Sequence, residues 1–401
     1  MSTKLKSHVR RVASGRHSIW KEKQPLLHWL DVELTERCNN DCVHCSINRP
    51  AGDADVRARE LSTDSIKTVL RQAAELGCLT VRFTGGEPLL REDFADVYVF
   101  ARRLGLQARL FTNATLLTPD LAGLLARIPP LEKVEVSLYG MSRASYEVVT
   151  RIPGSYDAAR RGVGLLLENK VPFVVKTIIH PANESEFPGF KSWAISILGK
   201  DHPPQAVAFF NLRSRRDSEL KNSSIRELRP SPEKALKILT AESLAYVREM
   251  KRQCQRRQEE RGTGIFRCGA GQGMAALDAY GILQPCLLLR HPEAVYDLKA
   301  GSLRDAMSGF FPSLRRREPR NLLYLERCAE CFLSWLCEQC PAKSWVEHGT
   351  LDTPVEYWCD LARIQAEYLG LLKKGEEPWG VKDGEMRLRQ FIRSVPEPKS
   401  P

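Results

Sequence analysis

The sequence lacks several features that would assign it to a membrane, secreted or nucleic-acid-binding class. It has no run of roughly 18 apolar residues, so we expect no membrane-spanning helix. Its basic N-terminus is not followed by an apolar stretch and a cleavage site, so we expect no secretory signal peptide. No basic stripe interleaved with aromatic residues occurs. The formal net charge of +11 therefore predicts a solvated, arginine-rich surface rather than a nucleic-acid partner.

Length and cysteine content are the features that the sequence does have. A chain of 401 residues exceeds the usual size of one hydrophobic core, so we expect one large domain and a smaller one. Twelve cysteines without an export signal indicate a reducing compartment, the cytoplasm. In such a compartment, closely spaced cysteines bind metals more often than they form disulfides.

Apolar runs typical of β-strands alternate with helical patterns between residues 28 and 211. We predict strands at 30–36, 79–84, 107–112, 132–138, 172–179 and 205–210, with helices between them. Ser62 or Thr63 is suited to cap the helix that ends near Gly77, and Pro119 to the first turn of a later helix. Alternating β and α units predict a parallel sheet, and six units suit a partial (β/α)6 TIM-like barrel of the α/β class.

Three cysteines with C-x3-C-x2-C spacing, Cys38, Cys42 and Cys45, follow the first predicted strand. Three thiolates can hold three irons of a cubane [4Fe-4S] cluster and leave the fourth iron open to a small molecule. The alternative is a set of structural or zinc-binding cysteines. Zinc sites normally have a fourth close ligand, which His44 would have to supply.

This triplet resembles the signature of the radical SAM enzymes. The resemblance implies that the three thiols hold the cluster and that S-adenosylmethionine (SAM) binds the fourth iron. One electron, expected from a flavodoxin- or ferredoxin-type donor, then cleaves the sulfonium to methionine and a 5′-deoxyadenosyl radical that takes a hydrogen atom from substrate. His44 lies where the family usually carries an aromatic residue beside the adenine; a loop-packing histidine is the alternative.

Parallel sheets place their chemistry at the C-terminal ends of their strands. Directly after the second predicted strand come four residues suited to bind a ligand, Gly85, Gly86, Glu87 and Pro88. Glycines let the backbone approach a ligand closely, and a carboxylate can receive an ammonium group. Taken alone the four residues indicate only a turn. After the cysteine loop, they look like the family segment that binds the methionine amino group of SAM.

Three further strand ends are expected to line the cofactor by the same resemblance. Asn113 follows the third strand, Ser137 ends the fourth and Lys176 lies on the fifth. We assign Ser137 to the ribose side and Lys176 to a polar contact. The alternative for each is a helix cap, a turn residue or an exposed strand end.

Seven cysteines lie in the last third of the chain: Cys268, Cys286, Cys328, Cys331, Cys337, Cys340 and Cys359. Two close C-x2-C pairs are a strong metal signal, and seven thiols exceed one four-coordinate site, so two metal centres are expected. The spacing resembles the SPASM domain, a C-terminal extension of radical SAM enzymes that carries two auxiliary [4Fe-4S] clusters.

By that resemblance one auxiliary cluster takes four cysteines, Cys328, Cys331, Cys337 and Cys359. The other takes Cys268, Cys286 and Cys340. Cys337 and Cys340 are separated by two residues where the family usually has three. The second cluster also lacks an obvious fourth cysteine, so an open iron is one expectation. Cys254, on a charged helix, is the nearby candidate ligand but is expected to be unligated.

The sequence predicts five segments. They are a basic N-terminal segment (1–27), a radical SAM partial barrel (28–212), a charged helical bridge (213–262), a SPASM auxiliary-cluster domain (263–372) and a loosely held C-terminal tail (373–401). The bridge is expected to have a solvated face, with substrate binding as the alternative. Because about 28 residues precede the first strand, no separate leader-binding module is expected there.

The expected activity is hydrogen abstraction from a ribosomally made peptide, leading to a crosslink, a thioether, epimerisation or oxidation. The alternative is the same cofactors acting on a sugar, a porphyrin or a redox-cofactor precursor. Sulfatase maturation is not expected, because those relatives carry aspartate where this chain has Leu287. A zinc-ribbon binding protein would explain the C-terminal pairs but not the triplet.

Overall fold

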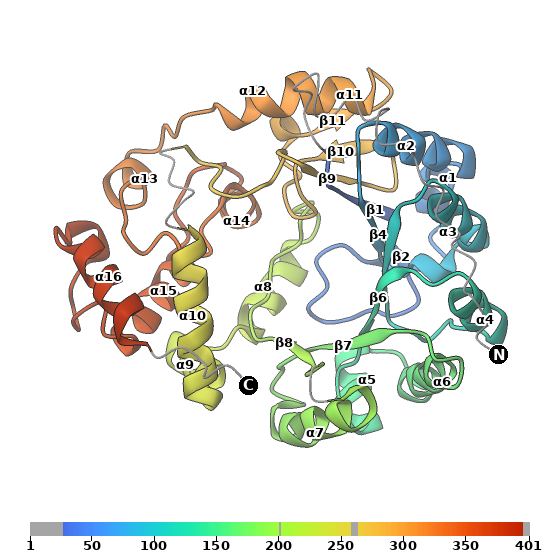
Figure 1. Cartoon of the computed structure of the whole chain (residues 1–401), viewed down its shortest axis with the longest axis horizontal. Helices are drawn as coiled ribbons and strands as arrows, with labels where there is room; N and C mark the ends of the chain where they lie inside the picture. Colours follow the sequence, from blue (N-terminus) through green and yellow to red (C-terminus); the bar gives the residue numbers. More distant parts are fainter. Residues whose placement is uncertain (1–26, 200–201, 258–263, 396–401) are drawn as a thin grey trace, which may run out of the picture. The chain divides into compact units, whose positions relative to one another are not determined.

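The computed structural model describes residues 27–199, 202–257 and 264–395 (Figure 1). The chain divides into two compact units. The first comprises residues 1–228, 269–287 and 292–312, and the second comprises residues 229–268, 288–291 and 313–401. The predicted basic N-terminal segment lies outside the described residues except for Leu27. Within the described residues, every helix is too short or too polar to cross a lipid bilayer.

A nine-stranded sheet organises the described part of the first unit, in the order β11-β10-β9-β1-β4-β5-β6-β7-β8. Its parallel core consists of β1 (Trp29–Thr35), β4 (Thr80–Gly85), β5 (Gln107–Thr112), β6 (Leu131–Ser137), β7 (Phe173–Ile178) and β8 (Gln205–Val207). These strands fall on the six predicted ones, although β8 is shorter than expected. The α/β fold class with its mostly parallel sheet is thereby confirmed.

The helices that connect these strands are α1 (Ala54–Arg59), α2 (Thr63–Glu75), α3 (Phe94–Arg103), α4 (Pro119–Arg127), α5 (Arg143–Thr150), α6 (Ser155–Glu168) and α7 (Phe187–Leu198). In Figure 1, α2, α3, α4 and α6 lie on one side of the sheet, and α8 (Glu219–Leu228), which follows β8, lies on the other side. Two predicted signals for the start of a helix are confirmed, at the N-termini of α2 and α4. Ser62 caps α2 by accepting a hydrogen bond from the backbone N–H of Ser65, and Pro119 opens α4.

Three strands that the sequence did not predict extend the sheet beyond β1. They are β9 (Met274–Leu277), β10 (Ile282–Gln284) and β11 (Tyr296–Asp297). β9 pairs parallel with β1, and β10 returns antiparallel to it through a turn at Gly281, where φ is +94°. The short helices α11 (Leu303–Asp305) and α12 (Phe311–Arg315) follow, and the boundary between the units falls within α12. The start of the predicted cysteine-rich domain therefore belongs to the sheet.

The two faces of the sheet carry different chemistry. On β1, Leu30 and Val32 alternate with Asp31 and Glu33, and all four are buried. The polar face carries ion pairs across the strands. Arg82 pairs with Asp31 at 2.6 Å, Arg109 pairs with Glu135 at 2.9 Å, and Lys176 also pairs with Glu135.

The second unit is helical. Its helices are α9 (Pro232–Leu239), α10 (Ser243–Arg257), α13 (Leu322–Arg327), α14 (Pro341–His348), α15 (Glu356–Tyr368) and α16 (Gly384–Ser394). The prediction of a loosely held tail after residue 372 is wrong. Leu388 and Phe391 of α16 are buried in a core with Leu333, Leu336 and Ala366. The tail was misread because its charged residues hide a short amphipathic pattern; residues 396–401 lie outside the described part.

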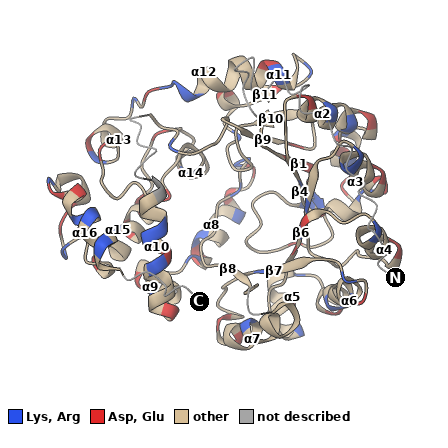
Figure 2. Cartoon of the chain, viewed as in Figure 1, with Lys and Arg blue, Asp and Glu red and all other residues tan. Residues whose placement is uncertain are grey.

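Charged residues are spread over many elements of both units. Figure 2 shows Lys and Arg on α3, α8, α10 and α16, with acidic positions among them. Many pair locally, as Arg387 does with Glu376 at 2.6 Å. This distribution agrees with the expected solvated surface.

Candidate active site

The loop that carries the cysteine triplet is tied down at both ends. After β1 the chain forms β2 (Arg37–Cys38), which pairs parallel with β3 (Arg49–Pro50). The guanidinium of Arg37 is buried and donates to Glu60 at 2.8 Å. Within the loop, the backbone N–H groups of Asp41 and Val43 donate to carbonyls at the end of α5, both at 2.9 Å. The loop is therefore a fixed part of the first unit.

The three thiols lie close enough to influence one another. Burial, with a smaller contribution from Glu87, raises the pKa of Cys38 to about 12. Burial and then the neighbouring thiols Cys45 and Cys38 raise the pKa of Cys42 well above its ordinary value. Binding of a metal replaces such a proton, because only the thiolate is a ligand. Three converging thiols thus fit the three irons that an iron–sulfur cluster would present.

The paired glycines bring the end of β4 against the chain that leads into this loop. The backbone N–H of Gly86 donates to the carbonyl of Thr35 at 2.7 Å, and that of Glu87 donates to the carbonyl of Arg37 at 2.9 Å. A Cβ atom on Gly86 would lie 2.2 Å from the Arg37 carbonyl oxygen, and one on Gly85 would lie 2.1 Å from that of Thr35. The sequence analysis expected a ligand at this close approach. The structure places the cysteine loop's own backbone there.

The Glu87 carboxylate is fully buried and holds two strand ends together. It accepts hydrogen bonds from the Thr112 hydroxyl at 2.8 Å, from the backbone N–H of Asn113 at 2.8 Å and from that of Leu89 at 3.1 Å. Burial raises its pKa to about 7 although these donors favour the carboxylate. Pro88 begins the 3₁₀ turn that follows.

Asn113 links the end of β5 to the cysteine loop. Its side-chain amide donates to Asn39 at 3.0 Å and to the Cys38 sulfur at 3.8 Å. Asn39 in turn donates to the Thr115 hydroxyl at 2.7 Å. Hydrogen bonds of this kind orient a ligand thiol, so Asn113 contacts the predicted site through Cys38.

His44 lies in an aromatic pocket. Its ring centroid is 5.2 Å from that of Tyr139 in an edge-on arrangement and 5.8 Å from that of Phe210. Burial lowers the pKa of His44 to about 3, and His180 contributes to the shift. His44 therefore carries no charge at neutral pH.

His180, just beyond β7, is a site residue that the sequence analysis missed. Its Nδ1 accepts a hydrogen bond from the backbone N–H of Ala182 at 3.1 Å, so its proton lies on Nε2. A lone histidine after an apolar strand carries no signal in the sequence. Only the fold brings it near His44.

Several of the buried polar groups without hydrogen-bond partners among the described residues lie in the cysteine loop or interact with it. They are the side-chain amide of Asn40, Nδ1 of His44, the hydroxyl of Tyr146, which interacts with Cys42 and Cys38, and Nε2 of His180, which acts on His44. Buried polar groups in native proteins are nearly always paired. Their position beside three thiols fits a polar cofactor next to a metal cluster.

Ser137 and Lys176 lie on the same sheet but in different surroundings. Ser137 ends β6 and interacts with Tyr139, which hydrogen-bonds Cys42. Lys176 is part of the ion-pair row, with its ammonium 4.0 Å from the centre of the Phe111 ring. Burial lowers the pKa of Lys176 despite its pairing with Glu135. The cofactor contacts of both residues stay predictions.

The start of the predicted bridge packs on the cysteine loop, which the sequence analysis did not foresee. Arg213 is buried and donates to the Cys45 carbonyl at 3.4 Å and to Asn48 at 3.2 Å. Lys221 of α8 also donates to Asn48, at 2.6 Å. Arg215 pairs with the buried carboxylates of Glu36 and Asp278, at 2.7 and 2.8 Å. Charge clusters read as solvated surface in a sequence, whereas the fold turns these cations inward.

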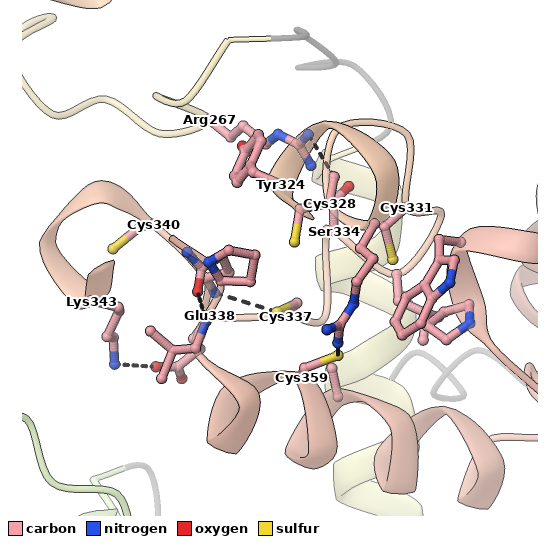
Figure 3. Close-up of a pocket in the computed structure, with 18 of the residues that line it drawn as sticks. Arg267, Tyr324, Cys328, Cys331, Ser334, Cys337, Glu338, Cys340, Lys343 and Cys359 are labelled. Atoms are coloured by element: carbon pink, nitrogen blue, oxygen red, sulfur yellow. Dashed lines mark hydrogen bonds and ion pairs between the residues drawn. The ribbon is translucent and has the colours of Figure 1, made fainter. Parts of the chain in front are cut away.

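The second unit contains a cavity of about 330 Å³ lined by C-terminal cysteines (Figure 3). Cys328, Cys331, Cys337 and Cys359 point into it. Burial raises the pKa of Cys337, the most enclosed of them, and the other three thiols all contribute to this shift. Within the described ranges, no three His, Cys, Asp or Glu side chains are grouped to hold a single metal ion. The thiols instead surround a larger space, as a four-iron cluster requires.

The remaining cysteines differ in their surroundings. Cys340 and Cys268 belong to the second unit, and burial, with a smaller contribution from Cys268, raises the pKa of Cys340. Cys286 follows β10 and belongs to the first unit. Cys254 is completely buried in the apolar core of the second unit, and the Cys78 thiol donates to the Thr80 carbonyl at 3.2 Å. All twelve cysteines are free of disulfides.

Comparison with known proteins identifies the first unit. The sequence model of the radical SAM superfamily matches residues 32–194. The AdoMet-dependent heme synthase of Methanosarcina barkeri is 33% identical over 161 residues, which are 40% of this chain and 44% of that protein. The PqqA peptide cyclase of Gluconobacter oxydans is 33% identical over 157 residues, 39% of this chain and 43% of that protein. Both alignments span less than half of the relative.

Two solved structures share the fold. Streptococcus suis SuiB bound to precursor peptide SuiA has a TM-score of 0.59 at 16% identity, over 85% of this chain and 78% of that one. The native anSMEcpe structure with bound AdoMet and Cp18Cys peptide has a TM-score of 0.60 at 14% identity, over 92% and 100%. The family match and the shared fold together show that residues 32–194 form a radical SAM domain.

Proposed function

We propose that this enzyme reductively cleaves SAM at a cluster held by Cys38, Cys42 and Cys45 and abstracts a hydrogen atom from a peptide. One observation carries the proposal. Buried polar groups without partners on Asn40, His44, Tyr146 and His180 belong to the cysteine loop or interact with it. SAM offers amino, carboxylate, ribose and adenine groups that such side chains can bind. The radical SAM domain supplies the chemical class.

The chain's residues have distinct roles in this proposal. When bound, the cluster supplies the electron that breaks the carbon–sulfur bond of the sulfonium. The ring of His44 packs beside the adenine, and Ser137 faces the ribose. The segment from Gly85 to Pro88 binds the methionine amino group while its backbone holds the cysteine loop in place. Lys176 makes a polar contact with the cofactor.

The names of similar proteins favour a peptide as the substrate. A relative is called PqqA peptide cyclase, and the structural neighbours contain a precursor peptide and the Cp18Cys peptide. The reaction would be a crosslink, a thioether, epimerisation or oxidation. A tetrapyrrole is the second candidate, because relatives of equal identity are called heme synthases.

We extend the proposal to two auxiliary [4Fe-4S] clusters in a SPASM-type arrangement. The thiols around the cavity of the second unit support the cluster at Cys328, Cys331, Cys337 and Cys359. Assignment of Cys268, Cys286 and Cys340 to the other cluster rests on their spacing. The twelve free thiols favour a reducing compartment, the cytoplasm, and a flavodoxin- or ferredoxin-type donor.

The first test is iron and sulfide content after anaerobic reconstitution. We expect about twelve irons per chain for the wild type and about eight for the variant with alanine at positions 38, 42 and 45. The variant should form no 5′-deoxyadenosine with SAM and dithionite. Cofactor cleavage by that variant would refute the assignment of the triplet.

The second test separates the two substrate classes. The reconstituted enzyme is incubated with SAM, reductant and either the short peptides encoded beside its gene or an iron porphyrin with propionate side chains. A mass change in a peptide that needs the intact triplet supports the peptide assignment. A mass change in the porphyrin alone would replace it with tetrapyrrole chemistry.

A further inference from the structure

Arg327 stands out among the residues around the cavity of the second unit. It is the last residue of α13 and directly precedes Cys328. Its Nη2 donates a hydrogen bond to the sulfur of Cys359 at 3.8 Å. Two thiols of the proposed cluster site are therefore connected to this residue, that of Cys328 through the chain and that of Cys359 through its side chain.

The guanidinium is held in this position from two other sides. Both oxygens of Glu356 accept hydrogen bonds from it, at 2.8 and 3.0 Å. The guanidinium carbon lies 4.3 Å from the centre of the Trp379 ring, within cation–π range. The Arg327 side chain is 18% exposed, whereas that of Glu356 is 59% exposed. Water therefore screens the carboxylate more strongly than it screens the cation.

A fixed cation beside a cluster thiolate acts on the redox equilibrium of the cluster. Reduction adds one negative charge to the cluster and its ligands. A hydrogen bond from a positive donor stabilises this extra charge, so it favours the reduced state and raises the reduction potential. The partly offsetting charge of Glu356 reduces the effect without cancelling it, because Glu356 is the more exposed partner.

We propose that Arg327 tunes the cluster at Cys328, Cys331, Cys337 and Cys359 toward accepting an electron. This inference rests on the proposed function, which places a cluster there. A cluster held by these four thiols would supply an acceptor for the one electron that the substrate loses after hydrogen abstraction. The substrate loses a proton or forms a bond with a nucleophile in the same oxidation. Arg327 is a positioning residue, since it acts on the cluster through Cys359.

The test is a redox titration of the full-length chain with alanine at positions 38, 42 and 45, so that only auxiliary clusters contribute. The cluster signals are followed by electron paramagnetic resonance against potential. We expect Arg327→Gln to lower the equilibrium constant for reduction of one cluster about tenfold, which is about 59 mV for a one-electron couple. Arg363→Gln is the matched control. Arg363 lines the same cavity and pairs with Glu377 at 3.5 Å, so its shift should be smaller.

A second variant works in the opposite direction. Glu356→Gln keeps an acceptor for the guanidinium but removes the offsetting charge, so the potential should rise. The potential of Glu356→Gln also tests the inference in the case that Arg327→Gln fails to retain iron. An unchanged or lower potential in Glu356→Gln, an unshifted potential in Arg327→Gln with full iron, or an equal shift in Arg363→Gln would overturn the inference.

Iron analysis distinguishes this failure from failure of the proposed function. If the parent chain binds no iron, the auxiliary clusters are absent and that part of the proposed function is refuted. If the parent chain binds about eight irons but the variants show no shift in potential, only the role of Arg327 is refuted.

Discussion

The backbone N–H of Asn113 donates a hydrogen bond to the buried carboxylate of Glu87 at 2.8 Å. The side chain of Asn113 then reaches the thiol of Cys38 at 3.8 Å. These two contacts connect the end of β4, the end of β5 and the first cysteine of the triplet. The carboxylate of the Gly-Gly-Glu-Pro segment thus helps to shape the cysteine loop.

Replacement of Glu87 tests this connection. Glu87→Gln keeps the size of the side chain but turns one acceptor oxygen into a donor amide. One of the three donors around it then lacks an acceptor, so we expect a loss of about 1–3 kcal/mol in the free energy of unfolding. Denaturant unfolding of the metal-free chain measures this. A variant as stable as the wild type at low pH would contradict the buried network.

The raised pKa of Glu87 also predicts a pH dependence. Burial raises the pKa from 4.5 in the unfolded chain to about 7 in the folded chain. Between these values the folded state binds the proton more tightly, so the free energy of unfolding falls as pH rises through this window. Glu87→Gln lacks that contribution. The advantage of the wild type over the variant should therefore shrink between about pH 4.5 and 7; an advantage that grows would contradict the shift.

Gly86→Ala should disturb the cysteine loop. Its Cβ would lie 2.2 Å from the carbonyl oxygen and 2.5 Å from the carbonyl carbon of Arg37, which directly precedes Cys38. The backbone must move, so we expect about 1–3 kcal/mol of destabilisation and lower iron content of the triplet cluster.

Gly164→Ala is the matched control for this glycine. Gly164 lies inside α6 with no atom within 4 Å of a Cβ, so alanine should stabilise the chain by about 0.5–1 kcal/mol. Iron content and denaturant unfolding of both variants are the measurements. Full iron retention in Gly86→Ala would show that the loop tolerates the displacement.

Arg213→Gln should loosen the cysteine loop from the other side. Arg213 pairs with Asp217 at 2.5 Å and donates to the Cys45 carbonyl. Because the hydrogen bonds come from a buried charged donor, we expect a loss of about 1.5–3 kcal/mol and faster loss of iron in air. Arg226→Gln is the control, since Arg226 pairs with the exposed Glu219 and its loss should cost less stability than that of Arg213. Equal losses of stability and of iron in the two variants would show that Arg213 has no particular role in holding the cysteine loop.

Cys254→Ala should leave the iron content unchanged. The Cys254 thiol lies in the apolar core of the second unit beside Met250 and Leu336. We expect only the cost of a small cavity, about 1–2 kcal/mol, measured by thermal unfolding. A loss of about four irons would instead make Cys254 a cluster ligand.

The sequence by itself determined the positions of the six strands of the parallel core and of the cysteine loop that follows the first strand. Apolar period and cap residues act locally, so Ser62 and Pro119 could be read without a structure. The C-x3-C-x2-C spacing and the glycine pair are also local features. These local features could be interpreted because few other residue types can bind iron or let the backbone approach so closely.

Only the tertiary structure decided what depends on contacts between distant segments. It joined β9 to β1, turned Arg213 and Arg215 inward and brought His180 near His44. It also buried Phe391 of the supposed tail. The sequence around a charged or isolated residue does not indicate which distant segment its side chain will contact in the folded chain. Burial and pairing, which give them their roles, arise only when the chain has closed on itself.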